Sequence, residues 1–179
     1  MSNENSFIKE NKEKIEYLKN EITKAFSETE QPVKNNIALH ECEECCGVRK
    51  DFACVKWQDA SNKLLENNYD KIPLFSPEAF NYFLPAYLLY TLNNFYDEFS
   101  EVCEFTLYAL TPDKSWKNEN GDISSHWIEK FSLFTFAQMS SIYQFLALAK
   151  ENPIYRYNDA NSIERAFDRL REIKAASKK

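Results

Sequence analysis

His40, Cys42 and Cys45 are the residues whose types and spacing could most readily support chemistry. They lie in the segment LHECEECC, residues 39–46. An imidazole and two thiolates at this spacing suit zinc, although Cys46 could add a fourth donor only with awkward geometry. A structural zinc site usually takes a second ligand pair, whereas the remaining candidates are scattered (Cys54, Cys103 and His126). Zinc binding by His40, Cys42 and Cys45 is one interpretation, and buried thiols beside a locally hydrogen-bonded histidine are the other.

The same cysteines could also act as a nucleophile or as a redox pair. On a regular helix His40 and Glu44 share one face, but Cys42 points away from both, which disfavours a cysteine nucleophile with its own base. Cys42 and Cys45 have C-x-x-C spacing. The acids between them, Glu43 and Glu44, are expected to raise the pKa of both thiols and make them poor redox groups. Reduced or buried thiols are therefore the favoured interpretation.

The element that must position the rest of the chain is the segment PLFSPEAFNYFLPAYLLY, residues 73–90. Ser76 followed by Pro77 is typical of a helix start, because the serine can cap an N–H and proline loses no bond there. The following residues are almost all apolar, which predicts a core helix, and the run is too short to span a bilayer. Pro85 cannot donate to the carbonyl of Asn81, which predicts a kink and a possible small-ligand pocket beside it.

Further helices are expected on both sides of this segment. Their approximate ranges are 6–26, much of 37–57, 59–67, 96–110, 127–131, 135–150 and 162–175. Thr135 and Gln138 have the spacing of a capping box at the start of one of them. We expect an all-α fold: a single compact domain, residues 1–179, of six to eight helices around a Pro-kinked apolar central helix. Residues 1–5 and 176–179 are expected to be disordered.

Composition excludes several classes of protein. The chain of 179 residues has only two glycines, Gly47 and Gly121, which argues against phosphate loops and dinucleotide-binding fingerprints. A formal net charge of −6 argues against nucleic-acid binding and suits a basic protein partner. The polar N-terminal stretch has no secretory core, and five cysteines are an odd number. A cytoplasmic protein with reduced thiols and no membrane segment is expected.

Three blocks of sequence together resemble a known family. They are LHECEEC (39–45), PLFSPEAFNYFLPAYLLY (73–90) and FSLFTFAQMSSIYQFLALAK (131–150). In this order they resemble a bacterial domain family of unknown function with an H-x-C-x-E-C motif and a P-L-F-S-P-E-A-F…L-P-A-Y block. The resemblance covers about residues 25–150; the chain departs from the pattern at Phe136, where the family tends to have proline, and adds Cys46. It implies a small intracellular bacterial protein and no established reaction, ligand or partner.

The sequence favours a non-enzymatic binding protein over an enzyme, because no complete catalytic set is visible. Its partner is expected to be another protein, and an immunity or antitoxin-type role that neutralises a cognate partner is one concrete version. Two alternatives stay open: a zinc protein that uses His40, Cys42 and Cys45, and a small-ligand binder at the Pro85 kink. No other cofactor is expected.

Overall fold

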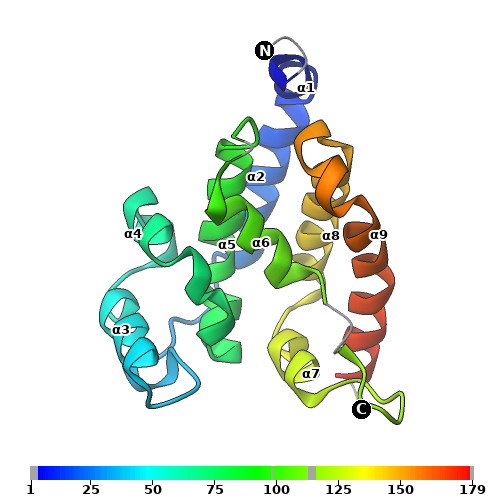
Figure 1. The fold of residues 1–179 in the computed structure, drawn as a ribbon. Helices are drawn as coiled ribbons and strands as arrows, with labels where there is room; N and C mark the ends of the chain where they lie inside the picture. The colour runs from blue at the N-terminus through cyan, green and yellow to red at the C-terminus, as the bar shows by residue number, and fades with distance from the viewer. Residues whose placement is uncertain (1–3, 98, 113–115, 178–179) are drawn as a thin grey trace.

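The computed structural model describes residues 4–97, 99–112 and 116–177, and most of these residues are helical (Figure 1). The α-helices are α1 (Glu4–Glu10), α2 (Lys12–Phe26), α3 (Glu43–Phe52), α4 (Asn62–Asn67), α5 (Pro77–Asn93), α6 (Glu101–Leu110), α7 (Ser125–Ser132), α8 (Phe136–Glu151) and α9 (Pro153–Ala176). Three short 3-10 helices join them: η1 (Lys34–Asn36), η2 (Trp57–Asp59) and η3 (Tyr69–Leu74). The described residues form no strand, only isolated bridges. The all-α prediction is confirmed.

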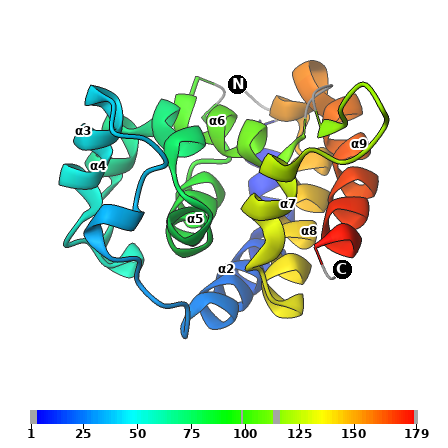
Figure 2. The same ribbon diagram turned by 90° about the horizontal axis from the view of Figure 1, so that it is seen from below.

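Helix α5 is buried along most of its length, as its apolar sequence predicts. Figures 1 and 2 show it between α3 and α4 on one side and α7, α8 and α9 on the other. Ser76 caps it, since its Oγ accepts from the N–H of Ala79 at 3.1 Å. Buried apolar side chains from α2 to α9 form one cluster around it. The helix continues through Pro85 to Asn93, and a kink at Pro85 stays a prediction.

The described residues contain nine α-helices, more than the six to eight expected. One reason is that the helix expected over 6–26 is divided at Asn11. The Asn11 backbone leaves the helical conformation (φ −106°, ψ 11°), and its Nδ2 donates to the carbonyl of Phe7 at 3.0 Å. A side chain that satisfies backbone groups locally competes with continued helix. The helix therefore ends at Glu10 and restarts at Lys12.

The segment 37–57 is helical over a much shorter range than expected. Residues 37–39 pair instead with the chain before α5: the N–H of Ser76 donates to Ile37 at 3.0 Å, and the N–H of Leu39 donates to Leu74 at 3.1 Å. The bridge between Ala38 and Phe75 commits this stretch to pairing with the chain before α5, and α3 begins only at Glu43. A tertiary contact thus overrides the local helical preference.

The described residues begin with a helix and end with one, followed only by its C-cap Ser177. Of the residues expected to be disordered, Glu4 and Asn5 lie in α1, and Ala176 ends α9. Residues 1–3 and 178–179 lie outside the described part of the chain. None of the helices within that part is long and apolar enough to cross a membrane.

Candidate functional site

The three predicted zinc ligands lie at the start of α3, but in different environments. His40 and Cys42 are exposed, whereas Cys45 is completely buried in the first turn of the helix. Cys42 is the N-cap of α3, and its Sγ accepts from the backbone N–H of Cys45 at 3.5 Å. Among the described residues, no three His, Cys, Asp or Glu side chains gather where they could hold a metal ion. Zinc binding at these residues stays a prediction.

Arg49 organises this turn, and sequence reasoning did not single it out. Its buried guanidinium donates to the carbonyls of Ala38 (3.2 Å) and His40 (2.6 Å). It also binds both carboxylate oxygens of Glu41, at 2.9 and 3.2 Å. A planar guanidinium can serve several acceptors at once, which explains why arginine suits this position. Arg49 therefore fixes residues 38–41 and with them the direction in which the chain enters α3.

The pKa values of the two thiols in this turn move in opposite directions. The backbone N–H of Cys45 is the main cause that lowers the pKa of Cys42, the Cys45 thiol adds to it, and Glu44 partly offsets it. Glu44 raises the pKa of Cys42, as expected, but the net shift is downward because the hydrogen bonds from Cys45 outweigh it. Burial is the main cause that raises the pKa of Cys45. A helix N-terminus outweighs the nearby carboxylates because its N–H points directly at the sulfur.

A second candidate site is a groove of about 380 Å³ with three glutamates along it. Glu28 and Glu30 follow the end of α2, and Glu78 lies in the first turn of α5. The rest of the groove is formed by smaller or polar side chains (Ala25, Thr29, Asn81, Leu133, Thr135 and Gln138). We call this hollow the acidic groove. It lies where three segments distant in the sequence meet, so the sequence alone did not predict it.

Gln138 holds the floor of the acidic groove together. Its Oε1 accepts from the N–H of Thr135 at 2.8 Å and from Nδ2 of Asn81 at 3.3 Å. Its Nε2 donates to Oγ1 of Thr29 at 2.9 Å. The predicted capping box of Thr135 and Gln138 is confirmed, but the same side chain also joins α8 to α5 and to the end of α2. The groove therefore has a fixed, hydrogen-bonded base.

Gln138→Ala is expected to lower the free energy of unfolding by about 2 kcal/mol. The variant loses one half of a capping box and leaves the buried Asn81 amide without its acceptor, and each effect costs about 1 kcal/mol. Urea denaturation followed by circular dichroism measures the change. Gln144→Ala, on the exposed face of the same helix, is the control, and a loss as large as that of Gln138→Ala would contradict a specific role for Gln138.

The chain matches a known protein family over a range that contains both candidate sites. The model of a family described as a family of unknown function (DUF6714) matches residues 14–165. The chain belongs to DUF6714. The matched part begins in α2, ends in α9 and includes the α3 turn and the acidic groove. No curated protein and no solved structure matches the chain.

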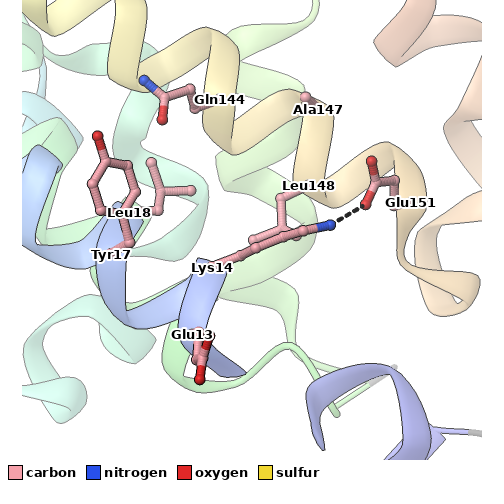
Figure 3. Close-up of a pocket in the computed structure, with 8 residues that line it drawn as sticks. All are labelled: Glu13, Lys14, Tyr17, Leu18, Gln144, Ala147, Leu148 and Glu151. Carbon is pink, nitrogen blue, oxygen red and sulfur yellow. Dashed lines mark ion pairs between the residues drawn. The ribbon is translucent and has the colours of Figure 1, made fainter. Parts of the chain in front are cut away.

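This DUF6714 chain has another hollow, of about 480 Å³, between α2 and α8 (Figure 3). Figure 3 shows Tyr17 and Leu18 on α2 facing Gln144 and Leu148 on α8. An ion pair between Lys14 Nζ and Glu151 Oε2, at 3.5 Å, crosses one end of it. Its acids are thus partly neutralised, which distinguishes it from the acidic groove. The predicted pocket at Pro85 also stays a prediction, since the groove that reaches α5 is lined by Asn81, one turn before Pro85.

Proposed function

We propose that this DUF6714 protein is a non-enzymatic binding protein of the bacterial cytoplasm that takes a basic segment of a partner protein into the acidic groove. Neutralisation of a cognate partner, as in immunity or antitoxin proteins, is the concrete role we assign to it. The observation that carries the proposal is the set of three carboxylates around one groove. Glu28, Glu30 and Glu78 have no ion-pair partner within the described part of the chain.

Charge complementarity supports a basic partner. A lysine or arginine side chain in the groove would meet carboxylates on the rim and the fixed polar floor around Gln138. The net charge of −6 adds a long-range attraction that speeds encounter with a basic surface. Arginine binds carboxylates in a bidentate manner, so an arginine-containing segment fits this chemistry best.

Apolar side chains beside the groove favour a macromolecular partner over a free cation. Leu133 lines the groove and is exposed, and Phe136 follows Thr135 at the start of α8. Phe136 is 89% exposed, the highest value among the large apolar side chains of the described residues. Aromatic side chains are enriched at protein interfaces. Leu133 would contact the partner within the groove, and Phe136 would extend the contact beyond it.

The double variant Glu28→Gln/Glu78→Gln is expected to bind the partner protein much more weakly than the wild-type chain does. The affinity-tagged wild-type chain and its variants would be produced in the native host, and the co-purifying proteins identified by mass spectrometry. Glu119→Gln/Glu129→Gln is the control, because it removes the same charge at exposed positions that do not line the groove. We expect a basic protein with the wild type and the control, and at least about tenfold less of it with the groove variant, as for loss of two charge-assisted contacts.

Two further results decide between versions of the proposal. For an immunity-type role, the captured protein must inhibit growth when produced alone and lose this effect when the wild-type chain is also produced. Equal capture by the groove variant and the control would reject the acidic groove as the binding site. Capture of a strongly acidic partner would contradict the inference that the acidic groove selects a basic segment.

A further inference from the structure

Cys42 and Cys45 form a pair with one accessible and one protected sulfur. Cys42 is exposed at the N-cap of α3, and Cys45, three residues later, is completely buried. The side chain of an N-cap residue folds back over the first turn of its helix. The 3.5 Å contact from the Cys45 N–H to the Cys42 sulfur places that sulfur over the first turn, beside Cys45. The two sulfurs are therefore neighbours, and only one of them can be reached from solvent.

This division matches the two roles in thiol–disulfide exchange. The attacking thiol must be accessible, and the thiol that completes the reaction must be close to it and shielded from other molecules. Cys46 is also exposed, but it follows Cys45 directly, and its sulfur lies 3.9 Å from Nη1 of Arg49. The Cys46 sulfur therefore lies beside Arg49, whereas the Cys42 sulfur lies beside the N–H of Cys45.

We propose that Cys42 and Cys45 are a redox-active dithiol, with Cys42 as the attacking and Cys45 as the resolving cysteine. The Cys42 thiolate attacks one sulfur of a disulfide in another molecule, which forms a mixed disulfide and releases the first thiol. Cys45 then loses its proton and attacks the Cys42 sulfur, which forms the Cys42–Cys45 disulfide and releases the second thiol. The chain is oxidised by two electrons, and the incoming disulfide is reduced to two thiols.

Formation of this disulfide acts directly on the start of α3. The Cys42 sulfur that accepts from the Cys45 N–H becomes part of a covalent link to the same residue. The capping sulfur is then a disulfide sulfur instead of a free thiol, and the link fixes the first turn. The turn held by Arg49 would therefore differ between the reduced and oxidised chains, in a region separate from the acidic groove.

Oxidised glutathione is a suitable probe of this dithiol. The reduced full-length chain, kept in a metal chelator so that zinc cannot protect thiols, is incubated with graded ratios of oxidised to reduced glutathione. Free thiols are alkylated, disulfides are reduced, and the released thiols receive a second label for mass spectrometry. We expect Cys42 and Cys45 to carry the second label together, while Cys46 and Cys54 carry the first. This readout needs no substitution and is therefore independent of variant stability.

Two variants test the order of the steps. Cys45→Ser is expected to accumulate one glutathione per chain on Cys42, because the resolving thiol is missing. Cys42→Ser is expected to react at least about tenfold more slowly than the control Cys54→Ser, which removes an exposed thiol outside the pair. Oxidation that links Cys42 to Cys46, that joins two chains, or that leaves Cys45 with the first label would overturn the proposal.

Discussion

We expect the substitution Arg49→Ala to lower the free energy of unfolding by about 3 kcal/mol. The substitution removes a buried guanidinium and leaves the carbonyls of Ala38 and His40 without their donor. Hydrogen bonds to a charged group contribute about 1.5–3 kcal/mol each, and buried acceptors without partners add to the loss. Two features limit the effect: Glu41 is exposed, so its ion pair contributes little, and Nε of Arg49 is already buried without a partner.

Urea denaturation followed by tryptophan fluorescence measures this change, and Arg171→Ala is its control. Arg171 is exposed and pairs only loosely with Asp168, at 3.7 Å, so its loss should change the free energy of unfolding by less than about 0.5 kcal/mol. Arg49→Lys should fall between the two, because one ammonium group cannot replace the planar fork. Equal stability of Arg49→Ala and wild type would show that residues 38–41 do not depend on this side chain.

Local signals in the sequence are sufficient to predict where a helix begins when its capping residues are close neighbours in the chain. Ser76 and Pro77 predict the start of α5, and Thr135 with Gln138 predicts the start of α8; both are confirmed. These signals act through neighbouring residues, so they do not depend on the fold. The start of α9 was placed too late, although Asn152 accepts from the N–H of Ile154 and Pro153 follows it, a cap of the same kind.

The surroundings of the candidate sites depend on contacts that the sequence does not reveal. The turn before α3 is fixed by Arg49 and by pairing with the residues before α5, more than thirty positions away. The pKa of Cys42 depends on the direction of one N–H, whereas sequence reasoning counted only the neighbouring charges. The acidic groove combines Glu28 and Glu30 with Glu78, and nothing in their local sequence predicts that they meet. Motif spacing thus found the thiols but not what surrounds them.

Lys130→Met is expected to stabilise the protein by about 2 kcal/mol at pH 7. Lys130 is a buried cation of α7 that has no carboxylate partner among the described ion pairs. Burial lowers its pKa from 10.5 to about 8. At about 1.4 kcal/mol per pKa unit, keeping the charge in the folded state costs about 3 kcal/mol. The rings of Phe80 (4.3 Å) and Trp127 (5.0 Å) offset about 1 kcal/mol of this cost, and methionine retains most of the packing.

The pH dependence of this gain follows from the sign of the pKa shift. Below pH 8 the lysine is charged in the folded and unfolded chains, so the full cost is present. Between about pH 8 and 10.5 the unfolded chain binds more protons, so the wild type becomes more stable relative to the variant as the pH rises. The advantage of Lys130→Met should therefore shrink from pH 7 to pH 9.5 in paired urea titrations. Lys150→Met, at a half-exposed site paired with Glu164, should show neither the gain nor the trend. A destabilised Lys130→Met protein with a constant difference across this range would mean that the amine is held by a partner that offsets its burial.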